Sequence, residues 1–519
     1  MSALIATLVA LGTLFAAGLR VPVFTGARRV IARIAVIAIA IAATLAANVA
    51  MFKHDAHFDV TREQAFTPAR ETLAVLGALD RDVELVYFYQ AQNPAGVAAK
   101  AMVELLGRSS ERLKVQTVDP DRYPGVANRL GVKLYNAALL RSGGEQIEVV
   151  TTDDREIALG IQRLLRRDRR PVCFLTGHGE YDIDNFEFHT HFEGRHSHSH
   201  DSQGMALVQM EQHGAGRLRR SLEKLGYGVR KISLATERTI PDACAAVAEI
   251  NPRTAYGPPE VEALAAWLGQ GGNLLMLLEP DFPVDAALVA LLARAGVKVG
   301  DGVVSDPKSH YYTDEQMIAI TAYARHPATF GLALSFFPGA RPVSAVAAPG
   351  VAATELFTTS AESRVLPRQS AEEVDHHALQ HERKSPHKHE HPHKQQHQDQ
   401  QKRSAPKAAP AGSRSLAVAS HGRLDGAEAG KPFRLVVIGD ADFASNSFFP
   451  YLSNADLVIG LVAWLRGEER GPAAKPPTET LPMVVLTNDQ MRSIFILCVL
   501  VLPGLMVLAG LGVWWRRRY

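Results

Sequence analysis

The sequence has 519 residues, of which 47% are apolar and 21% are charged, and its formal net charge is +2. This length is sufficient for two or three domains, each with a core of its own. The chain has no basic stripe interleaved with aromatic residues, which argues against a nucleic-acid-binding protein. The motif G-x-x-x-x-G-K-[ST] does not occur in the sequence, so we expect no ATP binding through a P-loop.

Three stretches without a charged side chain predict transmembrane helices at residues 1–19, 34–52 and 493–515. Each is close to the roughly 20 residues that cross a hydrocarbon core of about 30 Å. The loop 20–33 carries four arginines and no acidic residue, and three more arginines follow the last span. The positive-inside rule therefore places this loop and the C-terminus in the cytoplasm of a bacterial inner membrane, and the N-terminus and the large domain in the periplasm.

The first soluble segment, residues 53–170, shows strands and helices in the order β-α-β-β-β-α. Thr67 is predicted to cap a helix that begins at Pro68. The later elements are predicted at residues 83–89, 97–106, 113–118, 137–140, 146–150 and 156–166. This order resembles a thioredoxin-like domain. No Cys-x-x-Cys follows its first strand, so the resemblance implies a scaffold without dithiol activity.

The second soluble segment alternates strands with short helices, which predicts a parallel sheet with helices on both faces. Its strands are predicted at residues 171–175, 229–234, 245–250, 273–278 and 433–440. This domain covers residues 171–346, contains a His-rich insertion at 182–216, and is completed by 431–470. Residues 347–430 are predicted to be a disordered His-rich linker because they are rich in polar residues and proline. Residues 471–492 are predicted to be a linker to the third span.

Three cysteines occur, and Cys498 lies within the third predicted span. Cys173 and Cys244 lie in apolar, strand-like segments. We therefore expect them to be buried free thiols, and the sequence does not indicate a disulfide framework. Neither cysteine occupies a nucleophile elbow, so no catalytic residue is predicted.

Several segments in fixed order resemble the GldG-like family, the auxiliary components of gliding-motility-type ABC transport systems. They are FTPARETLAVLGALDRDVELVYFY, FLTGHGE, PPEVEALAAWLGQGGNLLMLLEPDFPVD, VVIGDADFASNSFF and the final WWRRRY. The resemblance implies an extracytoplasmic α/β core that is flavodoxin-like or glutamine-amidotransferase-like. It also implies a non-enzymatic subunit whose partners are a permease and a separate ATPase, and which binds a substrate or partner outside the membrane.

Polar residues follow two predicted strands and form the candidate binding site. They are Thr176, Gly177, His178, Gly179, Glu180, Asp440 and Asp442. Open α/β sheets bind ligands beyond the carboxyl ends of their strands, so these residues predict a site for a small ligand or a partner peptide. The competing interpretation is a tight turn with capping or solvated side chains.

Five histidines are close together in the predicted insertion: His189, His191, His196, His198 and His200. Neutral imidazoles at such spacing chelate Zn²⁺, Cu²⁺ or Ni²⁺ loosely, which gives an alternative function as a metal-binding or metal-responsive envelope protein. The competing interpretation is a solvated low-complexity loop. No cofactor and no structural zinc site is predicted, because structural sites have fixed ligand spacing.

Overall fold

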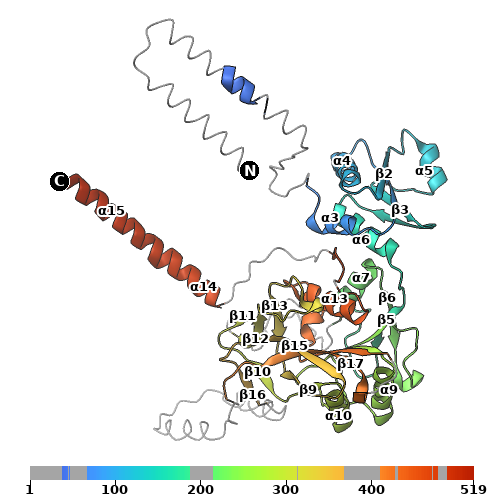
Figure 1. The fold of residues 1–519 in the computed structure, drawn as a ribbon, viewed down its shortest axis with the longest axis vertical. Helices are drawn as coiled ribbons and strands as arrows, with labels where there is room; N and C mark the ends of the chain where they lie inside the picture. The colour runs from blue at the N-terminus through green and yellow to red at the C-terminus, as the bar shows by residue number, and fades with distance from the viewer. Residues whose placement is uncertain are drawn as a thin grey trace, which may run out of the picture. The chain divides into compact units, whose positions relative to one another are not determined.

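The structure is a computed structural model, shown in Figure 1. It describes residues 38–44, 46, 67–187, 214–311, 314–367, 410–426, 431–469, 471–476 and 488–518. The chain divides into two compact units, Met1–Pro68 and Ala69–Tyr519. In the first unit the described residues 38–44 and 46 are helical and lie within the second predicted span. The first predicted span and the loop 20–33 lie outside the described residues.

One described helix is long and apolar enough to cross a membrane, at Arg492–Trp515. It consists of α14 (Asn488–Phe495), a π-helical segment (Ile496–Val501) and α15 (Leu502–Arg518). None of its most apolar stretch is buried against the rest of the chain. A helix of this length and composition occurs where the third span is predicted, and the other two spans stay predictions.

The first part of the second unit contains a four-stranded sheet in the order β2-β1-β3-β4. Its strands are β1 (Val83–Phe88), β2 (Leu113–Val118), β3 (Ala137–Ser142) and β4 (Glu145–Val150). β1 pairs with β2 in parallel and with β3 in antiparallel orientation. The turn between β3 and β4 contains Gly143 and Gly144, whose φ angles of 57° and 84° are those that glycine adopts without steric cost.

Four helices accompany this sheet: α3 (Arg70–Gly77), α4 (Pro94–Ser109), α5 (Pro124–Leu130) and α6 (Asp154–Leu165). The predicted cap of the first helix is wrong, because Ala69 and not Thr67 precedes it. The Ala69 amide donates to the Asp154 carboxylate over 2.9 Å, so a residue of α6 satisfies this helix end. The sequence did not predict α5, and the other elements follow the predicted order.

The larger sheet has seven strands in the order β15-β17-β18-β8-β7-β5-β6. Their bounds are β5 (Pro171–Leu175), β6 (Gly228–Ile232), β7 (Ala246–Ile250), β8 (Asn273–Leu277), β15 (Val351–Thr358), β17 (Ser415–Gly422) and β18 (Phe433–Ile438). The strands from β18 to β6 are parallel, as predicted, and β18 joins them although it lies far along the chain. β15 and β17 are antiparallel, so the sheet is mixed and the prediction of a purely parallel sheet is wrong.

The prediction of disorder throughout residues 347–430 is also wrong at both ends of that segment. β15, β17 and the short β16 (Arg364–Leu366) lie within it. The first six residues of β17 are buried, and this strand pairs with β18 from Ala417 to Gly422. The low-complexity middle of the segment dominates its average composition and conceals the apolar pattern of SLAVASHG. Residues 368–409 lie outside the described residues.

Helices cover both faces of the larger sheet, as predicted (Figure 1). α7 (Gly216–Lys224) and α13 (Asn454–Leu465) share one core cluster with Phe174 and Ala248. α9 (Pro258–Gly269) and α10 (Ala286–Arg294) share the other cluster with Cys173 and Val247. Successive residues of one strand thus enter opposite layers, because side chains alternate across a sheet.

Six short strands between α10 and β15, together with β16, form three small sheets in the orders β10-β16, β11-β12-β13 and β14-β9. They are β9 (Val297–Val299), β10 (Val303–Ser305), β11 (His310–Tyr311), β12 (Asp314–Ile320), β13 (Ser335–Pro338) and β14 (Val343–Ala345). The sequence did not predict them, because such short runs lack a clear period. The chain is therefore a mixed α/β protein with several sheets.

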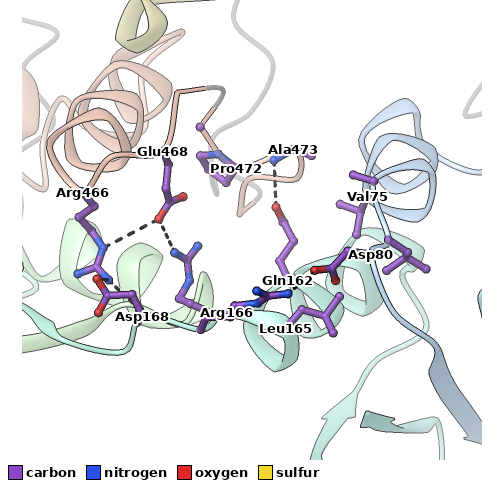
Figure 2. A pocket seen from close by; sticks show the side chains of 14 residues that line it. Val75, Asp80, Gln162, Leu165, Arg166, Asp168, Arg466, Glu468, Pro472 and Ala473 are labelled. Atoms are coloured by element: carbon purple, nitrogen blue, oxygen red, sulfur yellow. Dashed lines mark hydrogen bonds and ion pairs between the residues drawn. The ribbon is translucent and has the colours of Figure 1, made fainter. Parts of the chain in front are cut away.

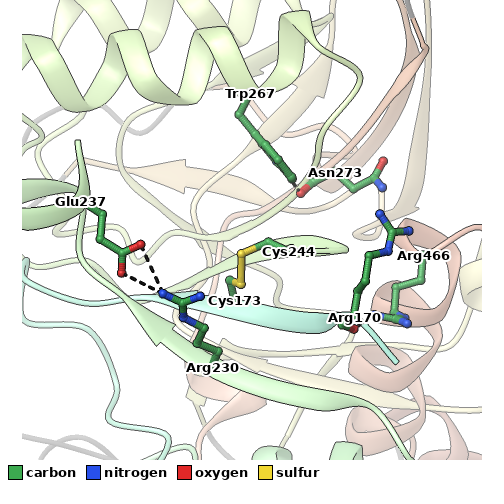
Figure 3. Close-up of a disulfide and its surroundings, with 8 residues drawn as sticks. All are labelled: Arg170, Cys173, Arg230, Glu237, Cys244, Trp267, Asn273 and Arg466. Atoms are coloured by element: carbon green, nitrogen blue, oxygen red, sulfur yellow. Dashed lines mark hydrogen bonds and ion pairs between the residues drawn. A yellow bond between two sulfur atoms is a disulfide. The ribbon is translucent and has the colours of Figure 1, made fainter. Parts of the chain in front are cut away.

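Cys173 and Cys244 form a disulfide, so the prediction of two free thiols is wrong (Figure 3). Cys173 lies in β5 opposite Val247 of the adjacent strand β7. Cys244 lies just before β7, where the Ala245 amide donates to the Pro171 carbonyl over 2.8 Å. The resulting Cα–Cα distance of 5.7 Å is the usual one for a disulfide. The partners are 71 residues apart in the sequence, and only the pairing of β5 with β7 brings them together.

Candidate site at the carboxyl edge of the large sheet

The loop 176–180 follows β5 and is closed by its own glutamate. One Glu180 carboxylate oxygen accepts hydrogen bonds from the amides of Gly177 at 2.9 Å and His178 at 2.7 Å. The Thr176 amide and hydroxyl both donate to the carbonyl of Ile232 at the end of β6. Gly177 and Gly179 have φ angles of 127° and 81°, which explains why glycine occupies both positions. The loop is thus tightly turned and anchored to the neighbouring strand.

The His178 side chain lies between two carboxylates. Its Nδ1 is 3.2 Å from a Glu180 oxygen, and its Nε2 is 3.1 Å from a Glu260 oxygen. The same Glu260 oxygen accepts the Gly257 amide at 2.7 Å, at the N-terminus of α9. The three side chains are only 10%, 5% and 14% exposed. His178 therefore connects the loop after β5 to the beginning of α9.

A buried acid lies behind this cluster. Glu249 in β7 is completely buried, and burial together with the nearby Glu180 and Glu260 raises the pKa of its carboxyl well above the ordinary value. The Tyr256 hydroxyl interacts with Glu249, but neither group has the geometry of a normal hydrogen bond. The Tyr256 ring packs against the His178 ring with centroids 4.6 Å apart. Burial thus favours the neutral form of the Glu249 carboxyl over the ionised form.

A second acidic group lies at the ends of β8 and β18. A Glu279 oxygen accepts the amides of Ala441 at 2.7 Å and Asp442 at 3.1 Å, and burial raises the pKa of Glu279 well above its ordinary value. The buried Asp440 accepts the amide of Phe443 at 2.9 Å. The Tyr181 hydroxyl donates to Asp442, and burial beside this acid raises the pKa of Tyr181.

The structure thus brings the predicted loop and the predicted aspartates to one edge of the sheet. Tyr181, which follows the loop directly, connects it to Asp442. Asp440 instead holds the backbone of its own turn, and Glu180 does the same for the loop, as the capping interpretation states. Five buried or half-buried residues of this edge were not predicted from the sequence: Tyr181, Glu249, Tyr256, Glu260 and Glu279.

Two of the missed residues carried a signal in the sequence. Glu260 is the third residue of a helix that begins Pro-Pro-Glu, and a glutamate there commonly binds the backbone at the helix start. Glu249 interrupts the apolar strand AVAEI, where a charged residue is unusual. Tyr256 and Glu279 lie in loops or at strand ends, and only the tertiary structure brings them to the site.

Exposed groups surround the loop at this edge. Gly177 and Gly179 are exposed, and so are Arg253 and Asp281, which form an ion pair at 3.4 Å. The Arg253 amide also donates to the His178 carbonyl over 2.7 Å. This edge therefore presents exposed backbone and both signs of charge to solvent. Ligand binding by the predicted residues stays a prediction.

The predicted metal ligands from His189 to His200 lie outside the described residues. The described chain on either side is held by Asn446, whose side-chain amide donates to the carbonyls of Asn185 at 2.7 Å and Glu187 at 2.9 Å. The Asn446 backbone amide donates to Gly214 at 2.7 Å. Among the described residues, no group of three His, Cys, Asp or Glu side chains is arranged to hold a metal ion. Metal binding by the histidines stays a prediction.

A separate pocket of about 390 Å³ lies between α3, α6 and the chain after α13 (Figure 2). Arg166 and Glu468 form an ion pair across it at 2.5 Å. Gln162 of α6 accepts the Ala473 amide at 3.0 Å and donates to the Ala474 carbonyl at 2.9 Å. The lining contains both signs of charge and none of the predicted site residues.

The model of the family described as "ABC-type uncharacterized transport system" matches residues 169–460. This match covers more than half of the 519 residues and includes every residue of the candidate binding site. The chain therefore belongs to this family and is an auxiliary component of an ABC-type transport system. No curated protein matches the chain.

Among solved structures, the mmIFT52 N-terminal domain has 14% identity and a TM-score of 0.35, covering 57% of this chain and 97% of that one. A mutant thioredoxin from Halobacterium salinarum has 24% identity and a TM-score of 0.15, covering 19% of this chain and 88% of that one. An exo-β-1,4-mannosidase from an Opitutaceae bacterium has 12% identity and a TM-score of 0.26, covering 72% and 49%. These likenesses are too weak to carry an argument about function.

Proposed function

We propose that this chain is a non-enzymatic, membrane-anchored subunit that binds a substrate or partner outside the cytoplasm and couples it to a permease. Membership of the transport-system family is the observation that carries the proposal. The sequence contains no P-loop, so ATP hydrolysis is assigned to a separate ATPase. The thioredoxin-like first domain is proposed to act as a scaffold.

The helix Arg492–Trp515 supports the proposed anchoring, because its length and composition suit a bilayer. Arg516, Arg517 and Arg518 follow it directly, which favours a cytoplasmic C-terminus. The spans at 1–19 and 34–52 complete the proposed topology. The body between residues 53 and 492 then lies in the periplasm of a bacterium.

The disulfide between Cys173 and Cys244 supports the same compartment. Disulfides persist in oxidising compartments such as the periplasm and are rare in the cytosol. The disulfide also removes the only cysteines of the soluble body as thiol nucleophiles. This supports a subunit that binds and does not catalyse.

The contact surface is proposed to be the carboxyl edge of the large sheet, at residues 176–180 and Asp442. The loop glycines are exposed, and so is the neighbouring ion pair of Arg253 and Asp281, which we include in this surface. Exposed backbone and an exposed ion pair suit a polar small ligand or a peptide of a partner.

Affinity purification of the full chain from native membranes in mild detergent tests this proposal. We expect a multi-span permease and an ATPase to co-purify. The double variant Arg253→Ala/Asp281→Ala should weaken that association, because it removes exposed contacts and leaves the core unchanged. The matched control is Lys308→Ala/Glu362→Ala, another exposed pair far along the chain. Isolation of the natural chain alone would contradict the proposed assembly.

A further inference from the structure

The two chain segments that lead from the soluble body towards the membrane spans both begin beside α6. The Ala69 amide, where the chain enters α3, donates to Asp154 at the start of α6 over 2.9 Å. Gln162 of the same helix holds residues 471–476, which we call the stem, by accepting the Ala473 amide at 3.0 Å (Figure 2). Positions 154 and 162 are eight residues apart, which corresponds to about 12 Å along a helix.

The stem is fixed firmly to the body. Ala474 is only 1% exposed, and its carbonyl accepts the Gln162 side-chain amide at 2.9 Å. Lys475 forms an ion pair with Asp456 of α13 at 3.2 Å. These contacts determine where the chain leaves the body before the apolar helix Arg492–Trp515.

The chain between the body and each span is short. The sequence advances 16 positions from 476 to Arg492, and 17 positions from the end of the second predicted span at 52 to Ala69. An extended chain covers at most about 3.5 Å per residue, so each segment reaches no further than about 60 Å. Because both segments begin beside the same helix, the spans draw this one face of the body towards the bilayer.

Exposed guanidinium groups surround Asp80 on this face, where Asp80 lines the pocket beside the stem. The Arg81 and Arg167 side chains donate to its carboxylate at 3.3 Å and 2.6 Å, and Arg112 donates to its backbone carbonyl. The side chains of Arg167 and Asp80 are 77% and 55% exposed. Ion pairs between such exposed groups are weak, so these arginines can exchange Asp80 for another anion.

We infer that the α6 face, which comprises α6, the stem and the three arginines around Asp80, rests on the phospholipid surface. Guanidinium groups bind phosphate oxygens in bidentate geometry, and phospholipid headgroups carry phosphate. Asp82 and Glu111 are also exposed near these arginines, so the contact depends on hydrogen bonds to phosphate and not on a large excess of positive charge. The inference rests on the proposed anchoring by the spans at 34–52 and 493–515.

Energy transfer from a dye on the full chain to acceptor-labelled lipid headgroups in nanodiscs tests this inference. The dye is attached through Glu111→Cys, beside Arg112, in a chain that also carries Cys498→Ala. The matched position is Glu262→Cys, an exposed residue of α9, which packs on the opposite layer of the large sheet from α13. We expect transfer from position 111 to be several-fold more efficient than transfer from position 262.

Replacing the three arginines measures their part in the contact. The variant Arg81→Gln/Arg112→Gln/Arg167→Gln should lower the ratio of docked to undocked bodies at least about tenfold, the effect of losing one hydrogen bond between charged groups. Transfer from position 111 should then approach that from position 262. The control makes the same change of charge at three exposed arginines elsewhere, Arg230→Gln/Arg238→Gln/Arg294→Gln, and should leave the transfer unchanged.

Equal transfer from both positions in a chain retained by the nanodiscs would overturn the inference. So would transfer from position 111 that stays unchanged in the arginine variant, with thermal unfolding showing that this variant is folded. The nanodiscs contain no permease, so failure of a permease to co-purify from native membranes would contradict the proposed assembly alone. A chain that carbonate removes from vesicles would contradict the proposed anchoring and this inference together.

Discussion

Two features of single residues in the large domain affect its stability: a disulfide and a buried acid. The disulfide joins β5 to the chain just before β7. Glu249 lies in strand β7, and its complete burial raises the pKa of its carboxyl. A covalent bond and a buried acid therefore act on adjacent strands, and each has a measurable effect on stability.

Removing the disulfide with Cys173→Ala/Cys244→Ala should destabilise the folded domain by about 2 to 5 kcal/mol, because a closed loop of the unfolded chain is released. Urea unfolding followed by tryptophan fluorescence measures the loss. Cys498→Ala is the matched control, since this thiol is exposed and free. Equal midpoints for the double variant and the control would contradict a formed disulfide.

Because Glu249 is buried, we expect the free energy of unfolding of the large domain to fall as the pH rises. In the folded protein the pKa of Glu249 is raised above the ordinary value of 4.5. Its contribution to the free energy of unfolding is therefore complete below pH 4.5 and is lost as the pH rises towards the pKa of the folded state. Glu249→Gln should therefore gain on the natural protein by up to about 1.4 kcal/mol per pH unit above 4.5. Unfolding measured at pH 4.5 and 7.5 tests this, with the exposed Glu262→Gln as control. An equal pH response in both variants would contradict a raised pKa of Glu249.

At the scale of elements, strands and helices with a clear hydrophobic pattern could be predicted from the sequence. The contacts of single side chains could not. The strands β2 and β5 occupy the predicted residues, because their apolar runs are bounded by charged residues or turns. β17 was missed because a low-complexity neighbour masks it. The order of the strands indicated that the loop 176–180 and the residues after β18 lie at the same edge of the large sheet. The contact of His178 with Glu260 depends on how α9 packs and could not be predicted.

The segment between β16 and β17 can be shortened to test whether β17 belongs to the sheet independently of the low-complexity residues before it. The described residues on either side are held together, since the Gly412 amide donates to Ser363 at 2.9 Å and the Thr359 amide donates to Arg414 at 2.9 Å. Replacing residues 368–409 by a short Gly/Ser linker should therefore leave the thermal midpoint within about 3 °C, because loop length contributes weakly to stability. Removing residues 415–422 as well should abolish cooperative unfolding. Similar losses for both deletions would argue against an independent role of β17 in the sheet.

Ion pairs near the pocket of Figure 2 differ in burial and so in expected strength. Arg166 and Glu468 are 11% and 30% exposed, and Tyr227 packs on Arg166 and donates to Glu468 at 2.9 Å. A double-mutant cycle with alanine should give a coupling of about 1.5 to 3 kcal/mol. The control pair of Arg167 and Asp80 is exposed and should give a smaller coupling, because solvent screens it. Equal couplings would show that burial does not strengthen this contact.

At the scale of the whole molecule, the account depends on which compartment contains the soluble body. Family membership establishes the transport system, and the proposed topology determines where the disulfide and the contact edge function. The arginine-flanked helix near the C-terminus and the disulfide each favour a body outside the cytoplasm. These two observations are independent, because one concerns lipid and the other concerns redox chemistry.

A pair of reporter fusions tests this placement most directly. Alkaline phosphatase inserted at the fully exposed Asp301 should be active, since this enzyme needs an oxidising compartment. Green fluorescent protein fused after Tyr519 should fluoresce in the cytoplasm of the same bacterium. Inactive phosphatase at Asp301 in a chain that is made and inserted would place the body in the cytosol and contradict the account.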